Sequence, residues 1–331
     1  MITITKPGLL STIQDLGRFG YQKYGVITSG AMDSLSHRLA NLLVGNEENK
    51  PTIEMTFLGP NVQFQEDALI AICGGDLSPT IQDRPVPMWR PVLVKKGAVL
   101  KFGYAKTGTR SYLAVAGGFS IPSIMNSTST YLRANLGGFH GRALQAGDKI
   151  AFAEKSHQSS KLIKKLINMD RNLPFVEMNW SISSELIPKL EKNPVFRVMK
   201  GRQYQLFTKE SQEWLWTEPF QISPQSDRMG YRLKGPMLRL EKAIEMLSEA
   251  VTFGTIQVPA DGNPIILMAD RQTTGGYPKI GEIASVDLPL LAQVKPNDTI
   301  HFTNITPEEA QLLYLEREKK IKQLKYGIYH L

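Results

Sequence analysis

The chain has 331 residues, of which 42% are hydrophobic and 21% are charged, a composition that excludes a wholly disordered protein. Its length suits two domains, since a domain holds roughly 150 residues. The net charge of +8 gathers largely in two stretches that contain no interleaved aromatic residues, 155–165 and 317–325. No helix-turn-helix, RNA-binding or zinc-finger pattern accompanies them, so we expect solvated basic faces and no nucleic-acid partner.

The single cysteine, Cys73, excludes an internal disulfide and agrees with a reducing compartment. It lies in the apolar run ALIAIC, so we expect a buried, inert thiol. The first residues, MITITKPGLLSTIQ, lack a signal-peptide pattern, and the longest apolar runs are too short to span a bilayer. We therefore expect a cytoplasmic protein with no membrane partner.

Short strand-like segments dominate the chain. Apolar or alternating runs are separated by Gly, Pro, Asp and Asn, which is typical of β-barrels and sandwiches. These runs are residues 68–73, 90–94, 99–103, 111–116, 149–152, 195–198, 255–258, 264–268 and 299–302. The pattern predicts a mainly β fold.

Two helices stand out against this background. Residues 33–44 carry leucines near helical spacing and stop at Gly45, and Ser29 and Asp33 are the candidate N-caps. The last helix starts at Thr306, with Pro and Glu at the first and third helical positions, and runs to about Lys325.

A polar, basic stretch without alternation begins at Glu154 and divides the chain. We predict an N-terminal β-barrel domain over 1–153, a basic connection or insert over 154–193, and a C-terminal β-barrel domain with its terminal helix over 194–331. The sequences LQAGDKIAF at 144–152 and VKPNDTIHF at 294–302 echo each other, which suggests two related β-domains.

Several familiar chemistries have no motif here. There is no GxxxxGK[ST], no GxGxxG after a strand and no kinase set, so any ATP chemistry in which this chain takes part must come from another chain. The five histidines are far apart and lack metal-ligand spacing, so we predict no metal site. VMKG at 198–201 is close to a biotin-carrier motif but lacks its second Met, and we interpret Lys200 as a strand-end lysine.

The densest polar cluster follows the apolar run 264–268 in the sequence ADRQTTGGYPKIG at 269–281. A strand that ends in an acid, a guanidinium, an amide and hydroxyls presents donors and acceptors at one place, and Gly275 and Gly276 allow close backbone approach. An ordinary polar turn is the alternative. The candidate residues are Asp270, Arg271, Gln272, Thr273, Thr274 and Tyr277.

Three further clusters lie beside glycines. Asp227 and Arg228 repeat the acid–arginine pair of Asp270 and Arg271; each pair is either a structural ion pair or a base or orienter beside a guanidinium that stabilises negative charge. In the N-terminal half, Arg18 is a candidate carboxylate clamp. The hydroxyl-rich run 127–141 leads to the other two candidates, Tyr131 and Arg133.

These segments, from about residue 5 to about residue 305, resemble the biotin-dependent carboxyltransferase family, which includes allophanate-hydrolase-subunit-2-like proteins and the C-type subunit of bacterial 5-oxoprolinase. The resemblance rests on long motifs in order, among them QDLGRFGYQKYGVITSGAMD, STYLRANLGGFHGRALQAGD, SDRMGYRLKGP and ADRQTTGGYPKIG. It implies two cyclophilin-like β-barrel domains. It also implies two partners, a B-type subunit that resembles the allophanate-hydrolase-subunit-1 family and an ATP-using A-type subunit.

The resemblance leads us to expect one chain of an ATP-dependent 5-oxoprolinase that cleaves 5-oxo-L-proline to L-glutamate, active in a complex and with no cofactor bound by this chain. Arg271 or Arg228 would stabilise the tetrahedral intermediate, and Arg18 or Arg133 would clamp the substrate carboxylate. Asp270 or Asp227 would act as base or orienter, and Gln272, Thr273 and Thr274 would supply hydrogen bonds.

Two alternatives stay open, because members of one family differ in activity. One is carboxyl transfer from carboxybiotin to a urea-like nitrogen, with biotin on a separate carrier. The other is a non-catalytic regulator that antagonises a sporulation-kinase inhibitor.

Overall fold

A computed structural model describes residues 1–167 and 173–330 of the chain. The chain forms two compact units. Unit 1 comprises 1–18, 33–188 and 319–331, and unit 2 comprises 19–32 and 189–318. The change from one unit to the other at Pro188 and Lys189 falls inside the predicted connection over 154–193, of which residues 168–172 lie outside the described residues. The assignment of 19–32 to unit 2 has no counterpart in the predicted boundaries.

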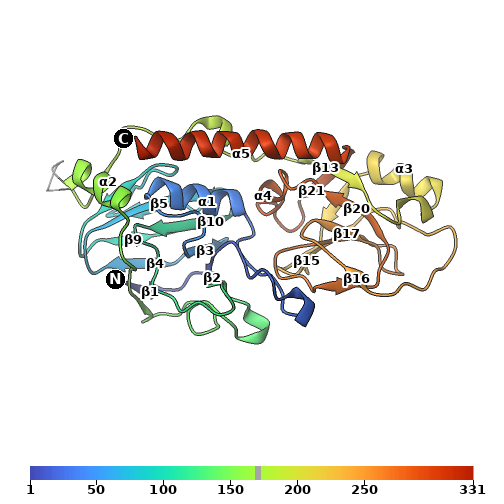
Figure 1. The fold of residues 1–331 in the computed structure, drawn as a ribbon, viewed down its shortest axis with the longest axis horizontal. Coiled ribbons are helices and arrows are strands. Elements are labelled where there is room, and N and C mark those ends of the chain that lie inside the picture. The colour runs from blue at the N-terminus through green and yellow to red at the C-terminus, as the bar shows by residue number, and fades with distance from the viewer. Residues whose placement is uncertain (168–172, 331) are drawn as a thin grey trace. The chain divides into compact units, whose positions relative to one another are not determined.

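Unit 1 contains two six-stranded sheets (Figure 1). The first runs in the order β11 (Lys149–Ile150), β1 (Ile2–Lys6), β4 (Asn61–Phe64), β9 (Val99–Lys101), β6 (Thr80–Ile81) and β7 (Arg84–Pro85). The second runs in the order β12 (Phe175–Glu177), β8 (Val92–Val94), β5 (Ala68–Asp76), β10 (Thr107–Val115), β3 (Thr52–Thr56) and β2 (Leu10–Gln14).

One hydrophobic core joins these two sheets. Ile2 and Ile4 of β1 pack in it together with Ile53 and Met55 of β3, all fully buried. The alternation along the strands decides this arrangement, because every second side chain points to the same face. Residues on the other face of β3, such as Glu54, are polar and also buried.

The first predicted helix is confirmed as α1 (Ser34–Leu43). The Asp33 side chain caps it by accepting a hydrogen bond from the backbone N–H of Ser36 at 2.9 Å. Of the two candidate N-caps, Asp33 is therefore the one the helix uses. The other helical segments of unit 1 are α2 (His157–Ile167), η2 (Leu132–Ala134) and η3 (Ser184–Leu186).

Unit 2 contains a closed seven-stranded barrel (Figure 1). Around the barrel the strands are β13 (Val195–Lys200), β20 (Lys279–Ile283), β17 (Thr255–Gln257), β18 (Ile265–Leu267), β15 (Gly230–Lys234), β14 (Phe220–Ile222) and β21 (Thr299–Asn304). Its core includes Met32, a fully buried residue from the N-terminal segment. The helical segments of this unit are η1 (Gln22–Tyr24), η4 (Tyr204–Leu206), α3 (Lys209–Thr217) and α4 (Leu288–Leu291).

The prediction of a mainly β fold is confirmed. In unit 2 the strands close into a barrel, whereas in unit 1 they form two sheets that share a core. The second predicted helix is confirmed as α5 (Pro307–Tyr329), which extends four residues beyond Lys325. Its start is a capping box, in which the Thr306 N–H donates to Glu309 Oε2 at 2.9 Å and the Glu309 N–H donates to Thr306 Oγ1 at 3.2 Å.

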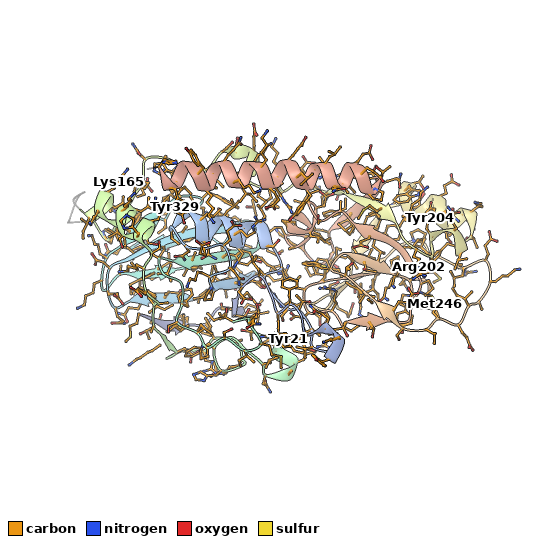
Figure 2. The ribbon with its side chains drawn as sticks, viewed as in Figure 1. Tyr21, Lys165, Arg202, Tyr204, Met246 and Tyr329 are labelled. Atoms are coloured by element: carbon orange, nitrogen blue, oxygen red, sulfur yellow. The ribbon has the colours of Figure 1, made fainter. Side chains whose placement is uncertain are left out.

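A two-stranded ribbon, β16 (Glu249–Ala250) paired with β19 (Thr274–Gly275), is tied to the barrel by ion pairs. Lys279 Nζ lies 2.8 Å from Glu249 Oε2 and Arg202 lies 3.2 Å from Glu249 Oε1 (Figure 2 labels Arg202 and the neighbouring Tyr204). The ribbon carries part of the predicted polar cluster, so these contacts fix where that cluster lies on unit 2. Among the described residues, no helix is both long and apolar enough to cross a membrane.

Candidate functional site

The antiparallel pairing of β15 with β18 brings two of the predicted charged residues together. Gly230 pairs with Leu267, and the ladder continues past both strands, where the Asp270 N–H donates to the Arg228 carbonyl at 2.8 Å. Arg228 just precedes one strand and Asp270 just follows the other. Their side chains therefore meet because of strand register, although 42 positions separate them in the chain.

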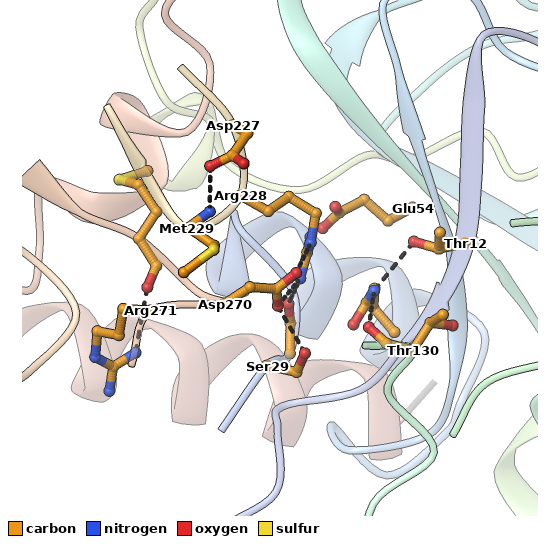
Figure 3. A network of polar contacts seen from close by, with 12 residues as sticks. Thr12, Ser29, Glu54, Thr130, Asp227, Arg228, Met229, Asp270 and Arg271 are labelled. Atoms are coloured by element: carbon orange, nitrogen blue, oxygen red, sulfur yellow. Dashed lines mark hydrogen bonds and ion pairs between the residues drawn. The ribbon is translucent and has the colours of Figure 1, made fainter. Parts of the chain in front are cut away.

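Arg228 and Asp270 form a buried, bidentate ion pair (Figure 3). Arg228 Nε donates to Asp270 Oδ2 at 2.9 Å and Arg228 Nη2 donates to Asp270 Oδ1 at 3.1 Å. The parallel arrangement of two charge-assisted bonds fixes both planar groups in orientation. It also neutralises the Arg228 charge within the protein.

Two residues from the N-terminal segment complete this pair. Ser29 Oγ donates to Asp270 Oδ1 at 2.6 Å, and the Gly30 carbonyl accepts from Arg228 Nη2 at 2.6 Å. Both Ser29 and Gly30 have left-handed backbone, with φ of 55° and 95°. For a residue with a side chain this conformation costs on the order of 1 kcal/mol, so its use at Ser29 is a sign of a specific constraint.

Arg271, next to the pair, has no carboxylate partner among the described residues. Its Nε is buried and has no hydrogen-bond acceptor within 1–167 and 173–330, and Nη1 makes a long hydrogen bond of 3.4 Å to the Met268 carbonyl. The guanidinium also lies 6.0 Å from the centre of the Phe253 ring. Burial lowers the pKa of the Arg271 guanidinium, with the charges of Glu282 and Asp270 opposing the shift. An arginine remains charged even so, which leaves a half-buried cation with donors to spare.

The residues after Arg271 present further polar groups. Gln272 and Thr273 are half-buried, Thr274 and Tyr277 are exposed, and none of their side chains has a hydrogen-bond partner within the described ranges.

The two glycines of this cluster differ in what they allow. Gly275 has a close neighbour, because a Cβ there would lie 2.4 Å from Gln257 Nε2, and the end of that buried side chain would have to shift. Gly276 has no neighbour nearer than 3.5 Å to such an atom, so only the first glycine of the pair meets this constraint.

Asp227 has a local role in the structure. Its Oδ1 accepts hydrogen bonds from the backbone N–H groups of Met229 at 2.8 Å and Gly230 at 3.2 Å, which stabilises the turn before β15. Because Arg228 lies within this turn, these hydrogen bonds also help to position Arg228. The catalytic role predicted for Asp227 stays a prediction.

Arg18, in unit 1, is fully buried and holds a loop together. Its Nε donates to the Ile124 carbonyl and its Nη2 to the Ser129 carbonyl, both at 3.0 Å. Asp15 gathers the same loop by accepting from the hydroxyls of Ser127 at 2.8 Å and Ser129 at 2.5 Å. These contacts give Arg18 a structural role; its predicted role as a carboxylate clamp stays a prediction.

Tyr131 and Arg133 follow that loop at η2, also in unit 1. Tyr131 is half-buried and exchanges backbone hydrogen bonds with Leu136 at 2.8 and 3.1 Å, while Arg133 is exposed. Of the two arginines predicted to clamp a carboxylate, Arg133 is the one whose side chain faces solvent. The predicted residues thus fall into a group on unit 1 and a group on unit 2.

Sequence reasoning missed a buried polar row on the second sheet of unit 1. Thr12, Glu54 and Tyr112 are neighbours across β2, β3 and β10, and Tyr112 Oη donates to Glu54 Oε2 at 2.7 Å. Burial raises the pKa of the Tyr112 phenol well above its usual value, with the charges of Glu54 and Asp33 acting in the same direction. The alternation of side chains along a strand places such residues on one face of the sheet, but polar residues on one face are normally expected to face solvent.

Gln14, beside this row, is also fully buried. Its Nε2 donates to Thr12 Oγ1 at 3.0 Å and to the Thr130 carbonyl at 3.2 Å, contacts that Figure 3 draws for Thr12 and Thr130. Its Oε1 has no hydrogen-bond donor among the described residues.

Ser29 is the most informative omission, because the sequence placed it only as a candidate helix cap. A Ser-Gly step before a helix is a weak signal, and the partner of its hydroxyl lies 241 positions away.

No group of three or more metal-ligating side chains occurs in the described part of the chain. His37 is instead a buried residue of unit 1 whose Nδ1 lies 2.9 Å from Thr52 Oγ1, and burial lowers its pKa to about 4.

Comparison with protein families matches residues 24–304 to a carboxyltransferase domain described as subdomain A and B. A relative from Haemophilus influenzae, named as the C-type subunit of 5-oxoprolinase, is 40% identical over 98% of this chain and 98% of its own length. The protein of that name from Escherichia coli K12 is 35% identical over 100% of this chain and 99% of its own length.

Larger enzymes also contain a similar region. The urea amidolyase of Saccharomyces cerevisiae is 32% identical over 98% of this chain, which corresponds to 18% of that protein. A crystal structure of the Kluyveromyces lactis urea amidolyase matches with a TM-score of 0.87 at 30% identity, over 98% of this chain and 20% of that one. The chain therefore spans about a fifth of the length of these urea enzymes.

Proposed function

Because the chain belongs to the family of carboxyltransferase domains with subdomains A and B, we propose that it is the C-type subunit of a 5-oxoprolinase. The assembly would cleave 5-oxo-L-proline to L-glutamate, with ATP handled by a partner. Two full-length relatives that carry this name support the proposal. The lack of any ATP-binding motif in this sequence agrees with a partner that supplies ATP.

The observation that carries the proposal is the guanidinium of Arg271, which has no carboxylate partner among the described residues. Cleavage of a lactam requires that the carbonyl oxygen be polarised and that the negative charge of the tetrahedral intermediate be stabilised. A half-buried cation with unused donors suits this work, because electrostatic stabilisation is stronger where water is partly excluded. Arg228 is less suited, since Asp270 already neutralises it.

In this proposal Asp270 acts as an orienting group. Both of its oxygens already accept hydrogen bonds, from Arg228 and from Ser29, which leaves it poorly placed to take a proton from substrate. The pair instead fixes the backbone from which Arg271 extends. The side chains of Gln272, Thr273 and Thr274, which have no partner in the described ranges, would complete the hydrogen bonds to the substrate.

Glutamate release from 5-oxoproline tests the proposal. The chain would be purified with its A-type and B-type partners and assayed with ATP, without ATP, and with this chain omitted. We expect glutamate only when ATP and this chain are both present. A stable three-component assembly that releases no glutamate would contradict the proposal.

A second candidate function is carboxyl transfer to a urea-like nitrogen, which the similarity to urea carboxylase domains favours. Biotin, held on a separate carrier, would supply the carboxyl group, and the Arg271 donors would suit the negative charge on its ureido oxygen. Adding avidin to the assay separates the two, because it would stop a biotin-dependent reaction and leave 5-oxoproline cleavage unchanged.

A further inference from the structure

The segment 19–32 lies far from the C-terminal half in sequence but belongs to unit 2. Within this segment, Ser29 and Gly30 contact the Arg228–Asp270 pair (Figure 3 labels Ser29). Neither residue belongs to the strands β15 and β18 whose pairing brings Arg228 and Asp270 together. Ser29 and Asp270 are both buried. The pair is thus held by its own ladder and by a second, distant segment of the chain.

From this geometry we infer that Ser29 is a positioning residue for the reaction, acting through Asp270 and Arg228. The inference rests on the proposed function and extends it to the N-terminal segment. The Ser29 hydroxyl donates to the same Asp270 oxygen that receives Arg228 Nη2, so it limits rotation of the carboxylate. The Gly30 carbonyl holds the same Nη2 through a second hydrogen bond.

The backbone conformation at this point supports the same inference. Ser29 and Gly30 are consecutive residues with positive φ, and this pair of conformations directs a hydroxyl and then a carbonyl at one ion pair. Glycine or asparagine would satisfy the backbone at position 29 more easily than serine. A serine there is explained by the hydrogen bond that its hydroxyl makes.

The consequence for catalysis concerns Arg271. The Asp270 carboxylate and the Arg271 guanidinium come from adjacent residues, and the Asp270 backbone is bonded to the Arg228 carbonyl. If the Asp270 carboxylate could rotate, it would hold Arg228 less firmly. The backbone of Asp270, which is hydrogen-bonded to Arg228 and from which Arg271 continues, would then also be held less firmly. Because misplacement of a catalytic group lowers the rate more than it lowers affinity, loss of the Ser29 hydroxyl should act on kcat.

The test compares Ser29→Ala, Ser29→Gly and Ser29→Thr in the assembled complex. Removal of a hydrogen bond to a charged group corresponds to a loss of about tenfold in kcat, with KM changed by less than about twofold. Thr keeps the hydroxyl but places a β-branched residue at positive φ, so it should lower Tm and keep most of kcat. Gly relieves the backbone and should still lose kcat.

Thr28→Val is the matched control, since it removes the neighbouring hydroxyl, which accepts from Gln22 Nε2 at 3.1 Å. It should leave kcat and KM unchanged. If kcat instead follows Tm across the three Ser29 variants, the role of Ser29 is purely structural and the inference is wrong.

A second measurement does not depend on turnover. In the full chain labelled with ¹⁵N-arginine, the Arg228 Nε–H signal, assigned with Arg228→Lys, should shift and exchange faster in Ser29→Ala but not in Thr28→Val. If the wild-type complex releases no glutamate, the proposed function fails while this signal still reports on the pair. An Arg228 signal unaffected by Ser29→Ala would overturn the inference by itself.

Discussion

Arg228 and Asp270 face each other across the end of one antiparallel ladder, with two hydrogen bonds of 2.9 and 3.1 Å between their side chains. Each belongs to one of the two acid–arginine dipeptides, so this ion pair joins the arginine of one dipeptide to the acid of the other. This exchange leaves Asp227 on a turn and Arg271 without a carboxylate partner among the described residues. The two dipeptides are alike in sequence, but their acids and arginines therefore have different surroundings in unit 2.

Replacement of Asp270 should destabilise the chain strongly. Asp270→Ala removes the carboxylate that pairs with the buried Arg228, and breaking a buried pair in this way costs about 3–5 kcal/mol. Urea unfolding of the purified chain measures the free energy of unfolding. Asp227→Ala, which removes an exposed turn carboxylate, is the control and should cost about 1 kcal/mol or less. Equal losses in the two variants would contradict a buried pair.

Replacement of Arg271 should affect the reaction and leave the fold intact. Arg271→Ala removes one charge-stabilising donor, for which a rate loss of about 10²–10³ in kcat is expected, and Arg271→Lys should recover part of it. The assay is ATP-dependent glutamate release by the assembled complex. Arg232→Ala provides the matched control, since Arg232 is an exposed arginine on β15. Unchanged kcat in Arg271→Ala would remove Arg271 from the mechanism.

Gly275→Ala should destabilise unit 2 through the Gln257 side chain. The added methyl would lie 2.4 Å from Nε2 of a residue that is almost fully buried, so overpacking by about 1 kcal/mol or more is expected. Gln257→Ala in the same chain should relieve the clash, and a double-mutant cycle on Tm would measure this coupling. Gly276→Ala, with no atom nearer than 3.5 Å, should have a smaller effect.

Acid should weaken unit 1 through Asp148. Arg142 donates two hydrogen bonds of 2.8 Å to this carboxylate and lowers its pKa below the usual range. A carboxyl pKa that is lower in the folded state stabilises the fold above its unfolded value of about 4, and the contribution is lost as the pH falls through the folded value.

The variant Asp148→Asn should therefore flatten the acid limb of a plot of Tm against pH between about pH 5 and pH 2. Asp83→Asn, which removes an exposed carboxylate with no ion pair among the described residues, should keep the wild-type slope. A steep limb that persists in Asp148→Asn would assign the acid sensitivity to other groups.

The amino-acid pattern was enough to predict the fold class and two of the helices. Leucine spacing with Asp33 as cap and the Thr306–Glu309 box are local signals, and the structure confirms both. The division of the chain was harder, because Met32 packs in the core of unit 2 while Asp33 starts a helix of unit 1. Composition does not mark a change of unit between adjacent residues.

For the candidate site, the sequence identified Arg228, Asp270 and Arg271 as important but could not say which acid meets which arginine. That choice depends on the register of β15 against β18, a long-range property that local patterns do not encode. Ser29 was missed for a related reason, since its hydroxyl is used 241 positions away. Glu54 was missed because a polar residue in an alternating strand is normally expected to face water.

The assignment of 19–32 to unit 2 limits how the protein can be dissected. A cut between Pro188 and Lys189 gives an N-terminal fragment that keeps Ser29 without Asp270, and a C-terminal fragment that lacks Met32 from its core. Neither fragment would be a complete folding unit, so separate expression of the two halves should yield insoluble or unstable products. Co-expression of both fragments, in contrast, offers a route to a split protein whose reassembly reports directly on the capture of residues 19–32.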